Sequence, residues 1–131
     1  MARSWLKPDT TREMSDPEAA WLAGVFDGEG SLVFYRRPNG KTGWAISIVN
    51  TCQELLDRCQ VVTGAGYFGS KRVNSGNKPQ YTWMVQRQRN IASLLRQMLP
   101  WLIVKREKAE AFLLQWRDLG GVAQVGRAPA S

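Results

Sequence analysis

The residues whose types and spacing could do chemistry lie in one short stretch, from Gly24 to Gly30. Upstream, Asp16 and Pro17 are typical of a helix start, with Asp16 as the N-cap, and Gly30 is expected to end that helix in a left-handed conformation. Glu29 would then lie at the helix C-terminus, where the dipole is negative and the last carbonyls have no intrahelical partner. A carboxylate beside free carbonyls favours a bound cation. A glycine-rich helix end with a solvated acid is the other interpretation.

Gly24 and Gly28 are four residues apart and therefore share one face of this helix. A face without side chains allows a second backbone to approach closely. The run from Leu22 to Gly30 closely resembles the nine-residue signature of the LAGLIDADG homing endonucleases, and the resemblance extends over roughly residues 17–117. It implies a site-specific double-strand DNA endonuclease.

The resemblance assigns roles to residues at matching positions. In the family, the acid second from the end of the signature binds the metal, and the preceding carbonyl is a ligand too. These positions are Glu29, where many members have Asp, and Gly28. The segment that begins at Pro100 resembles the family's proline-to-lysine segment and implies that Lys105 is the basic residue near the active site. Asn50 matches a polar residue, commonly Gln, that holds a nucleophilic water chain.

These assignments have plainer interpretations beside them. Lys105 could be a solvated helix lysine, and Asn50 could cap the helix that follows it. Asp27 is interpreted as structural and interfacial rather than catalytic. Arg58 is the nearest candidate for a third basic residue found in some members, but it aligns badly.

Hydrolysis of a phosphodiester needs a cation on the scissile phosphate and an activated water. Mg²⁺ prefers oxygen ligands and keeps waters that can attack, so it is the expected ion, with Mn²⁺ able to replace it and Ca²⁺ binding without supporting cleavage. One carboxylate is too little for a two-strand cut, so one signature per chain implies a homodimer with the signature helices crossing on the two-fold axis. The residues expected at this interface are Leu22, Ala23, Gly24, Phe26 and Asp27.

This arrangement has consequences for the DNA product. Two Glu29 residues near the axis would face the phosphates that flank one minor groove, about 6 Å wide. Cleavage there gives staggered cuts with 3′ overhangs, and a dimeric reader implies a pseudo-palindromic site.

Composition narrows the classes of function. The chain has 131 residues, a net charge of +7 and no histidine, which favours a polyanionic partner and excludes histidine-based nucleophilic and metal sites. No apolar run approaches the roughly 20 residues of a membrane span. Cys52 and Cys59 would share a helix face, where they cannot bridge, so buried free thiols in a reducing, intracellular compartment are expected.

Apolar periodicity predicts an α+β fold in the order αββαββα, a partial repeat of a helix and a hairpin. Thr51 and Glu54 fit a capping box at the second helix, whose apolar stripe would be Cys52, Leu55, Cys59 and Val62. The expected helices are 17–28, 52–63, 90–99 and 102–119, and the expected strands are 31–37, 44–49, 67–71 and 80–87.

Alternation along the strands predicts a four-stranded antiparallel sheet with helices on one face and a bare second face. The resemblance implies that this sheet is saddle-shaped and lies on double-stranded DNA, and the side chains of the bare face suit base edges in a major groove. The residues expected to bind DNA are Ser31, Val33, Tyr35, Arg37, Ser47, Lys71, Gln80, Thr82 and Gln86.

The chain is therefore read as a mobile arm over residues 1–15, one endonuclease domain over 16–119, and a loose tail over 120–131. The alternative function is a family member without cleavage activity that works as an RNA maturase, with intron RNA as its partner, or as a DNA-binding regulator. A structural domain unrelated to nucleic acid would leave the charge and the polar sheet face unexplained.

Overall fold

A computed structural model describes residues 10–69 and 78–118 of the chain. The elements follow the predicted order, with a short 3₁₀ turn and a fourth helix after the second hairpin. They are α1 (Asp16–Glu29), β1 (Gly30–Arg36), β2 (Thr42–Asn50), α2 (Gln53–Thr63), β3 (Tyr67–Phe68), β4 (Tyr81–Val85), α3 (Gln88–Met98), η2 (Leu99–Trp101) and α4 (Arg106–Asp118). Among the described helices, none is both long and apolar enough to cross a membrane.

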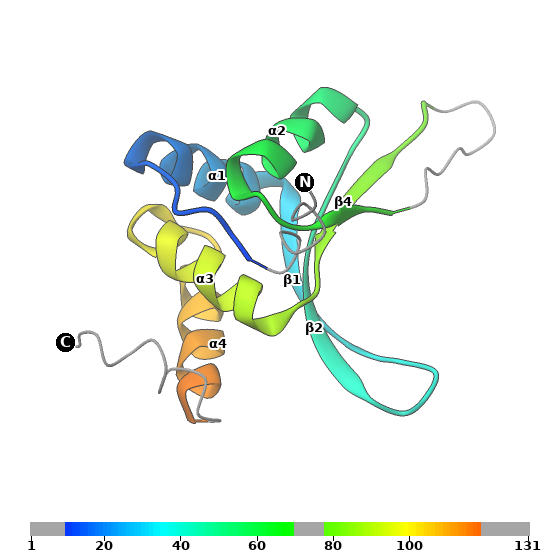
Figure 1. The fold of residues 1–131 in the computed structure, drawn as a ribbon, viewed down its shortest axis with the longest axis vertical. Coiled ribbons are helices and arrows are strands. Elements are labelled where there is room, and N and C mark those ends of the chain that lie inside the picture. The colour runs from blue at the N-terminus through cyan, green and yellow to red at the C-terminus, as the bar shows by residue number, and fades with distance from the viewer. Residues whose placement is uncertain (1–9, 70–77, 119–131) are drawn as a thin grey trace, which may run out of the picture.

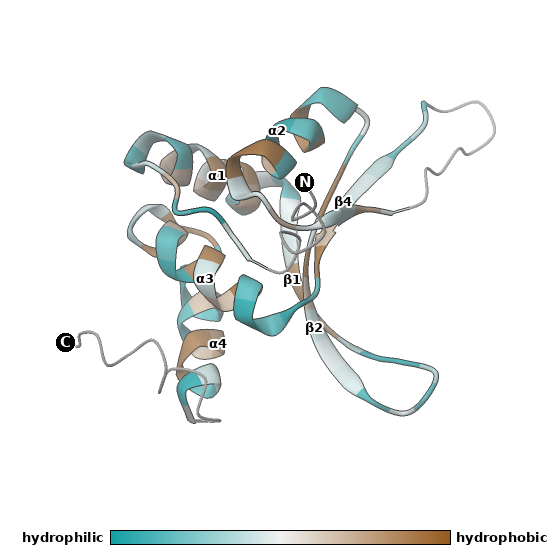
Figure 2. Cartoon of the chain, viewed as in Figure 1, coloured by the Kyte–Doolittle hydropathy of each residue, from teal (hydrophilic) through white to brown (hydrophobic). Residues whose placement is uncertain are grey.

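The four strands form one antiparallel sheet in the order β1-β2-β4-β3. The helices cover one side of it, while the β1–β2 hairpin and the β3–β4 pair extend away as two arms (Figure 1). The outer part of the β1–β2 arm is hydrophilic (Figure 2). The predicted α+β fold, with an antiparallel four-stranded sheet covered on one side, is confirmed.

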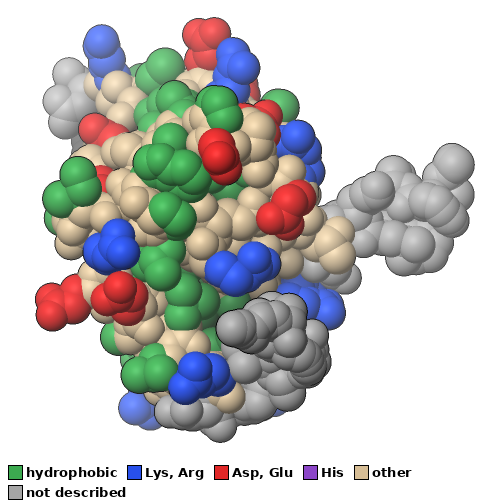
Figure 3. All heavy atoms as spheres, turned by 90° about the vertical axis from the view of Figure 1, so that its left-hand side faces the viewer, with side chains coloured by type: hydrophobic (Ala, Val, Ile, Leu, Met, Phe, Trp, Pro, Cys, Tyr) green, Lys and Arg blue, Asp and Glu red, His purple; other side chains and the backbone are tan. Residues whose placement is uncertain are grey.

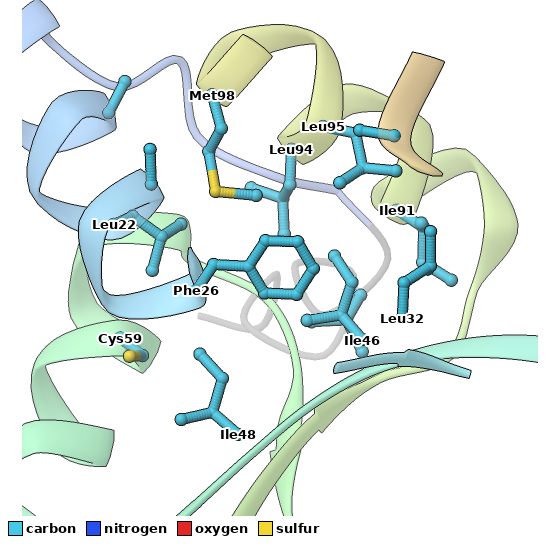
Figure 4. Packing of buried hydrophobic residues seen from close by; sticks show 14 of the residues in the cluster. Leu22, Phe26, Leu32, Ile46, Ile48, Cys59, Ile91, Leu94, Leu95 and Met98 are labelled. Carbon is cyan, nitrogen blue, oxygen red and sulfur yellow. The ribbon is translucent and has the colours of Figure 1, made fainter. Parts of the chain in front are cut away.

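The core lies between the covered face of the sheet and α1, α2 and α3. Phe26 of α1 lies between Ile46 of the sheet and Leu94 of α3 (Figure 4), and all three are almost fully buried. Trp83 of β4 is also fully buried, and its Nε1 donates to Gln60 Oε1 at 2.7 Å, so the indole N–H keeps a partner inside the core.

The start of α1 differs from the prediction by one residue. Ser15, not Asp16, is the N-cap, because its Oγ accepts the N–H of Glu18 while Glu18 Oε1 accepts the N–H of Ser15, which completes a capping box. The hydrogen bond from the Ser15 backbone lowers the pKa of Glu18. A serine hydroxyl and a glutamate three residues later satisfy two orphan N–H groups together, which an Asp16 cap would not do.

The end of α1 also differs from the prediction. Gly30 is extended, with φ −102° and ψ 171°, and begins β1 rather than forming a left-handed cap. A Cβ at Gly30 would lie 2.4 Å from Cδ1 of Phe26. The glycine is therefore needed for close approach to the core and not for a positive φ.

Residues 11–15 were expected in a mobile arm, but they pack between α2 and α3. Thr11 Oγ1 and Ser93 Oγ share a hydrogen bond of 2.7 Å, and the N–H of Arg12 donates to the carbonyl of Thr63 at 2.7 Å. Met14 is buried, and its N–H donates to Gln97 Oε1. Backbone hydrogen bonds and one buried side chain hold this segment, although its sequence has no periodic pattern.

Helix α2 begins without the predicted Thr51–Glu54 box. Its N-cap is Cys52, which makes no side-chain cap hydrogen bond. Leu56, not Leu55, packs in the core, and Cys52 is exposed while Cys59 is buried. Cys52 precedes the first helical residue of α2 as its N-cap, so it is not part of the buried face of this helix.

Candidate metal and nucleic-acid site

The C-terminal end of α1 meets the end of β2 at Glu29 and Asn50. Glu29 is the last residue of α1 and is exposed, and Asn50 Nδ2 donates to Glu29 Oε1 at 3.2 Å. Asn50 Oδ1 accepts the N–H of Cys52 at 2.8 Å. The backbone at the start of α2 thus orients the amide, and the amide in turn orients the acid.

Lys105 lies beside the same helix end. Its Nζ donates to the carbonyl of Asp27 at 3.0 Å and lies 5.6 Å from the centre of the Phe26 ring. Lys105 is half-buried and is bound to Asp27, which precedes Glu29 by two residues in α1. It is therefore not a freely solvated helix lysine. The cation also offsets the negative end of the helix dipole.

Asp27 joins α1 to the segment that precedes α4. Its two carboxylate oxygens accept the N–H of Ile103 at 2.7 Å and of Lys105 at 2.9 Å. Burial raises the pKa of Asp27, but the N–H groups of Ile103, Lys105 and Val104 and the charge of Lys105 outweigh burial and lower the pKa below its usual value. Both oxygens of Asp27 are used within the chain, which confines it to the structural part of its predicted role.

The donors at this end of α1 are oxygens. They are the Glu29 carboxylate and the carbonyl of Gly28, which has no helical N–H four residues ahead because the chain has entered β1. Within the described residues, no three side chains of the His, Cys, Asp and Glu types gather to hold a metal. Hard oxygen donors fit Mg²⁺ or Ca²⁺, but one chain supplies a single carboxylate.

The signature helix presents only part of the predicted interface. Leu22, Ala23 and Phe26 are buried in the core of their own chain, so their side chains cannot contact a second one, and that part of the prediction is wrong. They face inward because α1 packs on α3 and the sheet through this side. Gly24 and Gly28 lie on the exposed side, where an added Cβ would meet nothing within 4 Å.

Apolar side chains that the sequence did not single out lie next to this helix end. Ile103 is 82% exposed and Val104 is 71% exposed, in the segment that Asp27 binds. The side of the molecule that lies at the left of Figure 1 carries hydrophobic side chains with charged ones around them (Figure 3). The sequence placed Ile103 and Val104 in a helix over 102–119, but α4 begins at Arg106, so both residues lie in the connection that precedes it.

The register shows which predicted residues share the open face of the sheet. Ser31 pairs with Ser47, Ser47 with Met84, and Val33 with Ala45, as the alternation requires. Thr82 pairs with Val49 on the same face, and Gln80 and Gln86 continue the alternation of β4 at its two ends. Lys71 lies outside the described residues.

Tyr67 is an additional residue of the open face. It pairs with Met84, which places it with Ser31 and Ser47. Burial raises the pKa of Tyr67, the nearby Tyr35 phenol raises it further, and the Arg37 guanidinium opposes both. The two arms therefore curve enough for residues of opposite edge strands to interact, but β3 is too short for its alternation to be read from the sequence.

Arg58 lies on α2, where it lines a groove between α1 and α2 together with Pro17, Trp21 and Leu55. Exposed Lys78 lies just before β4.

The comparisons with known proteins come from sequence families and from solved structures. The family model described as LAGLIDADG-like domain matches residues 16–116. No curated protein matches the chain. A structure of the homing endonuclease I-CvuI with its Sro1.3 target in 2 mM Ca has a TM-score of 0.65 and 21% identity, and the match covers 82% of this chain and 71% of that one.

Two further structures show the same fold. I-CvuI with the I-CreI target C1221 in 2 mM Mg, in which the DNA is not cleaved, has a TM-score of 0.63 and 22% identity over 82% of this chain and 71% of that one. The archaeal intron-encoded homing endonuclease I-Vdi141I with DNA has a TM-score of 0.61 and 18% identity over 79% of this chain and 69% of that one.

Proposed function

The chain belongs to the LAGLIDADG family, and from this premise we propose that it is a site-specific double-strand DNA endonuclease that works as a homodimer. The observation that carries the proposal is the group formed by Glu29, Asn50 and Lys105 at the end of α1. The open sheet face and the net charge of +7 supply a surface for DNA. Structural neighbours solved with DNA support the same class of partner.

Glu29 and the Gly28 carbonyl would hold Mg²⁺, which when bound supplies a Lewis acid for the scissile phosphate and a polarised water. Mn²⁺ would replace it, and Ca²⁺ would occupy the site without supporting cleavage. The amide of Asn50 holds the carboxylate in place. The ammonium of Lys105, fixed by the Asp27 carbonyl, adds positive charge where negative charge develops on the phosphate.

The proposal of a homodimer rests on two features of the single chain, its open glycine face on α1 and its one free carboxylate at the end of that helix. A glycine inside a helix costs about 1 kcal/mol relative to alanine, and no atom of residues 10–69 and 78–118 fills the space beside Gly24 and Gly28. Close contact of two α1 helices would require the missing side chains of Gly24 and Gly28, and it would bring two Glu29 carboxylates together. Cuts across one minor groove would then leave 3′ overhangs at a pseudo-palindromic site.

The test compares wild type with Glu29→Gln on a plasmid that carries the DNA flanking the coding sequence, in the presence of Mg²⁺. Wild type should linearise the plasmid. Glu29→Gln should bind equally well but cut at least about 100-fold more slowly, because charge stabilisation by a bound metal contributes several kcal/mol. Glu54→Gln, an exposed acid in the first turn of α2, is the matched control.

Two outcomes would count against this function. Cleavage by Glu29→Gln at the wild-type rate would exclude Glu29 as the metal ligand. Tight binding by wild type without cleavage in Mg²⁺ or Mn²⁺ would instead support a DNA-binding regulator.

A further inference from the structure

Arg37, just beyond β1 on the open face, is held by another residue of that face. Its Nε and Nη2 both donate to Tyr35 Oη, at 3.3 Å and 3.0 Å. The guanidinium carbon also lies 5.6 Å from the centre of the Tyr35 ring, within the range of a cation–π contact. Two hydrogen bonds and one ring contact thus restrain an exposed arginine before any ligand binds.

Tyr35 is itself fixed by the strand beside it. It pairs with Gly43, and a Cβ at Gly43 would lie 3.1 Å from Tyr35 Oη and 3.2 Å from Cζ. The missing side chain allows the tyrosine ring to lie across β2. A larger residue at Gly43 would displace the hydroxyl that Arg37 needs.

The backbone of Arg37 is anchored as well. Its N–H donates to the carbonyl of Lys41 at 2.6 Å, and its carbonyl accepts the N–H of Gly40 at 2.9 Å. Gly40 has φ +88°, a conformation that glycine adopts readily, and Asn39 Oδ1 accepts the N–H of Lys41. Arg37 is therefore the first residue of the hydrogen-bonded turn between β1 and β2, and its backbone is held on both sides.

The free edge of the guanidinium determines what it can recognise. Tyr35 occupies the edge formed by Nε and Nη2, and among the described residues no acceptor contacts the opposite edge, formed by Nη1 and Nη2. Two parallel N–H donors match the O6 and N7 acceptors of guanine in the major groove. No other base offers two adjacent acceptors there.

We propose that Arg37, positioned by Tyr35, selects a guanine at one position in each half-site of the target. The inference rests on the proposed function and adds the identity of a base to it. The fixed orientation of the Arg37 guanidinium favours contact with a base edge over contact with a phosphate. A phosphate can be bound by a cation such as Lys78, which needs no fixed pair of parallel donors. Tyr35 is a positioning residue, and Arg37 makes the contact.

The test is selection of bound sequences from a pool of random DNA duplexes in Ca²⁺, followed by binding measurements on single-site variants. Wild type should select guanine at one position per half-site with about 10-fold or greater preference over the other bases. Arg37→Lys keeps the charge but not the fork, so it should lose this preference while binding the pool. Tyr35→Phe should reduce the preference about 5-fold, with the other positions unchanged.

Tyr81→Phe is the matched control, because it removes a phenolic oxygen from the covered side of β4. Gly43→Val should have the same effect as Tyr35→Phe, since its branched side chain would displace the ring without removing the hydroxyl. Tyr35→Phe with undiminished guanine preference, or Arg37→Lys with the wild-type motif, would overturn the inference while sequence-specific binding stands. Uniform weakening on every duplex by Arg37→Ala would identify a phosphate contact instead and would also overturn it. Wild type that selects no sequence would overturn the proposed function together with the inference.

Discussion

Asn50 uses its two amide atoms in different directions, with Oδ1 on the N–H of Cys52 and Nδ2 on Glu29. Asn50 is not the N-cap of α2, which is Cys52, but its side chain binds the turn before α2 and the acid at the end of α1 at the same time. Because the N–H of Cys52 can only donate, it binds the amide oxygen of Asn50 and leaves the amide nitrogen to face the acid. An aspartate at this position would keep the turn but face Glu29 with a second negative charge.

The two thiols should differ sharply in reactivity. Burial raises the pKa of Cys59 to about 12, whereas Cys52 is exposed. At pH 8 only about one Cys59 in 10⁴ would be a thiolate, and the thiolate is the nucleophile. Iodoacetamide should therefore modify one cysteine per native chain and both cysteines in guanidinium chloride, as measured by intact mass.

Cys52→Ser is the control for this experiment, because its native form should remain unmodified. Equal labelling rates of Cys52 and Cys59 in the native protein would contradict the burial of Cys59.

At the scale of elements, Asp27 links the end of α1 to the start of α4. Its pKa is lowered in the native chain, so the stabilisation is fully present above the unfolded value of about 3.9 and is lost as the pH falls through the native value. Asp27→Asn should lower the free energy of unfolding by about 1–3 kcal/mol at pH 7, since hydrogen bonds to a charged group are lost. The difference from wild type should shrink below about pH 4, as measured by urea unfolding across pH.

Asp57→Asn, at an exposed position of α2, should leave the pH dependence unchanged. If Asp27→Asn is as stable as wild type at pH 7, the carboxylate does not hold the segment before α4. Cleavage should fall together with stability, because Lys105 lies in the same segment.

Local patterns predicted the elements better than they predicted the junctions between them. Alternation identified the covered and open faces of β1, β2 and β4, because side chains alternate with a period of two in any strand. The one-residue differences at Ser15 and Cys52 arose because several residues could cap each helix, and the geometry of the cap decides between them. The packing of Met14 depends on partners in α3, which no local pattern contains.

The same limit applies to the candidate site. The resemblance predicted roles for Glu29 and Lys105, but it could not predict the Asp27 bonds to Ile103 and Lys105, which span more than 70 residues of sequence. Burial of Leu22 and Phe26 in their own core was not predicted, because α1 carries apolar and small residues on several sides and its sequence does not show which side packs on its own chain. Only the folded chain separates that face from the one at Gly24.

At the scale of the whole molecule, the described residues form one closed core, whereas the proposed function requires a site shared by two copies. The sheet has a covered face and an open face, and the core is closed without Gly24 or Gly28. By contrast, the described residues supply a single free carboxylate at the end of α1, and the proposed double-strand cut would need two such centres. The exposed Ile103 and Val104 extend the surface that a second copy would cover.

Substitutions at Gly24 should distinguish a monomer from a dimer, because a side chain added there would stabilise a monomer but would destabilise a dimer. In a monomer, Gly24→Ala would stabilise the helix by up to about 1 kcal/mol, because the added Cβ would contact no described part of the chain. In a dimer, the larger Gly24→Leu should force two α1 helices apart, at a cost of about 1–3 kcal/mol or more, and should lower both the dimer fraction in analytical ultracentrifugation and double-strand cleavage. Gly30→Ala is the contrasting variant, since its Cβ would clash with the Phe26 ring. It should lower the melting temperature of a monomer and of a dimer alike. A Gly24→Leu chain that melts higher than wild type, sediments like it and still cuts both strands would show that this face meets no second copy.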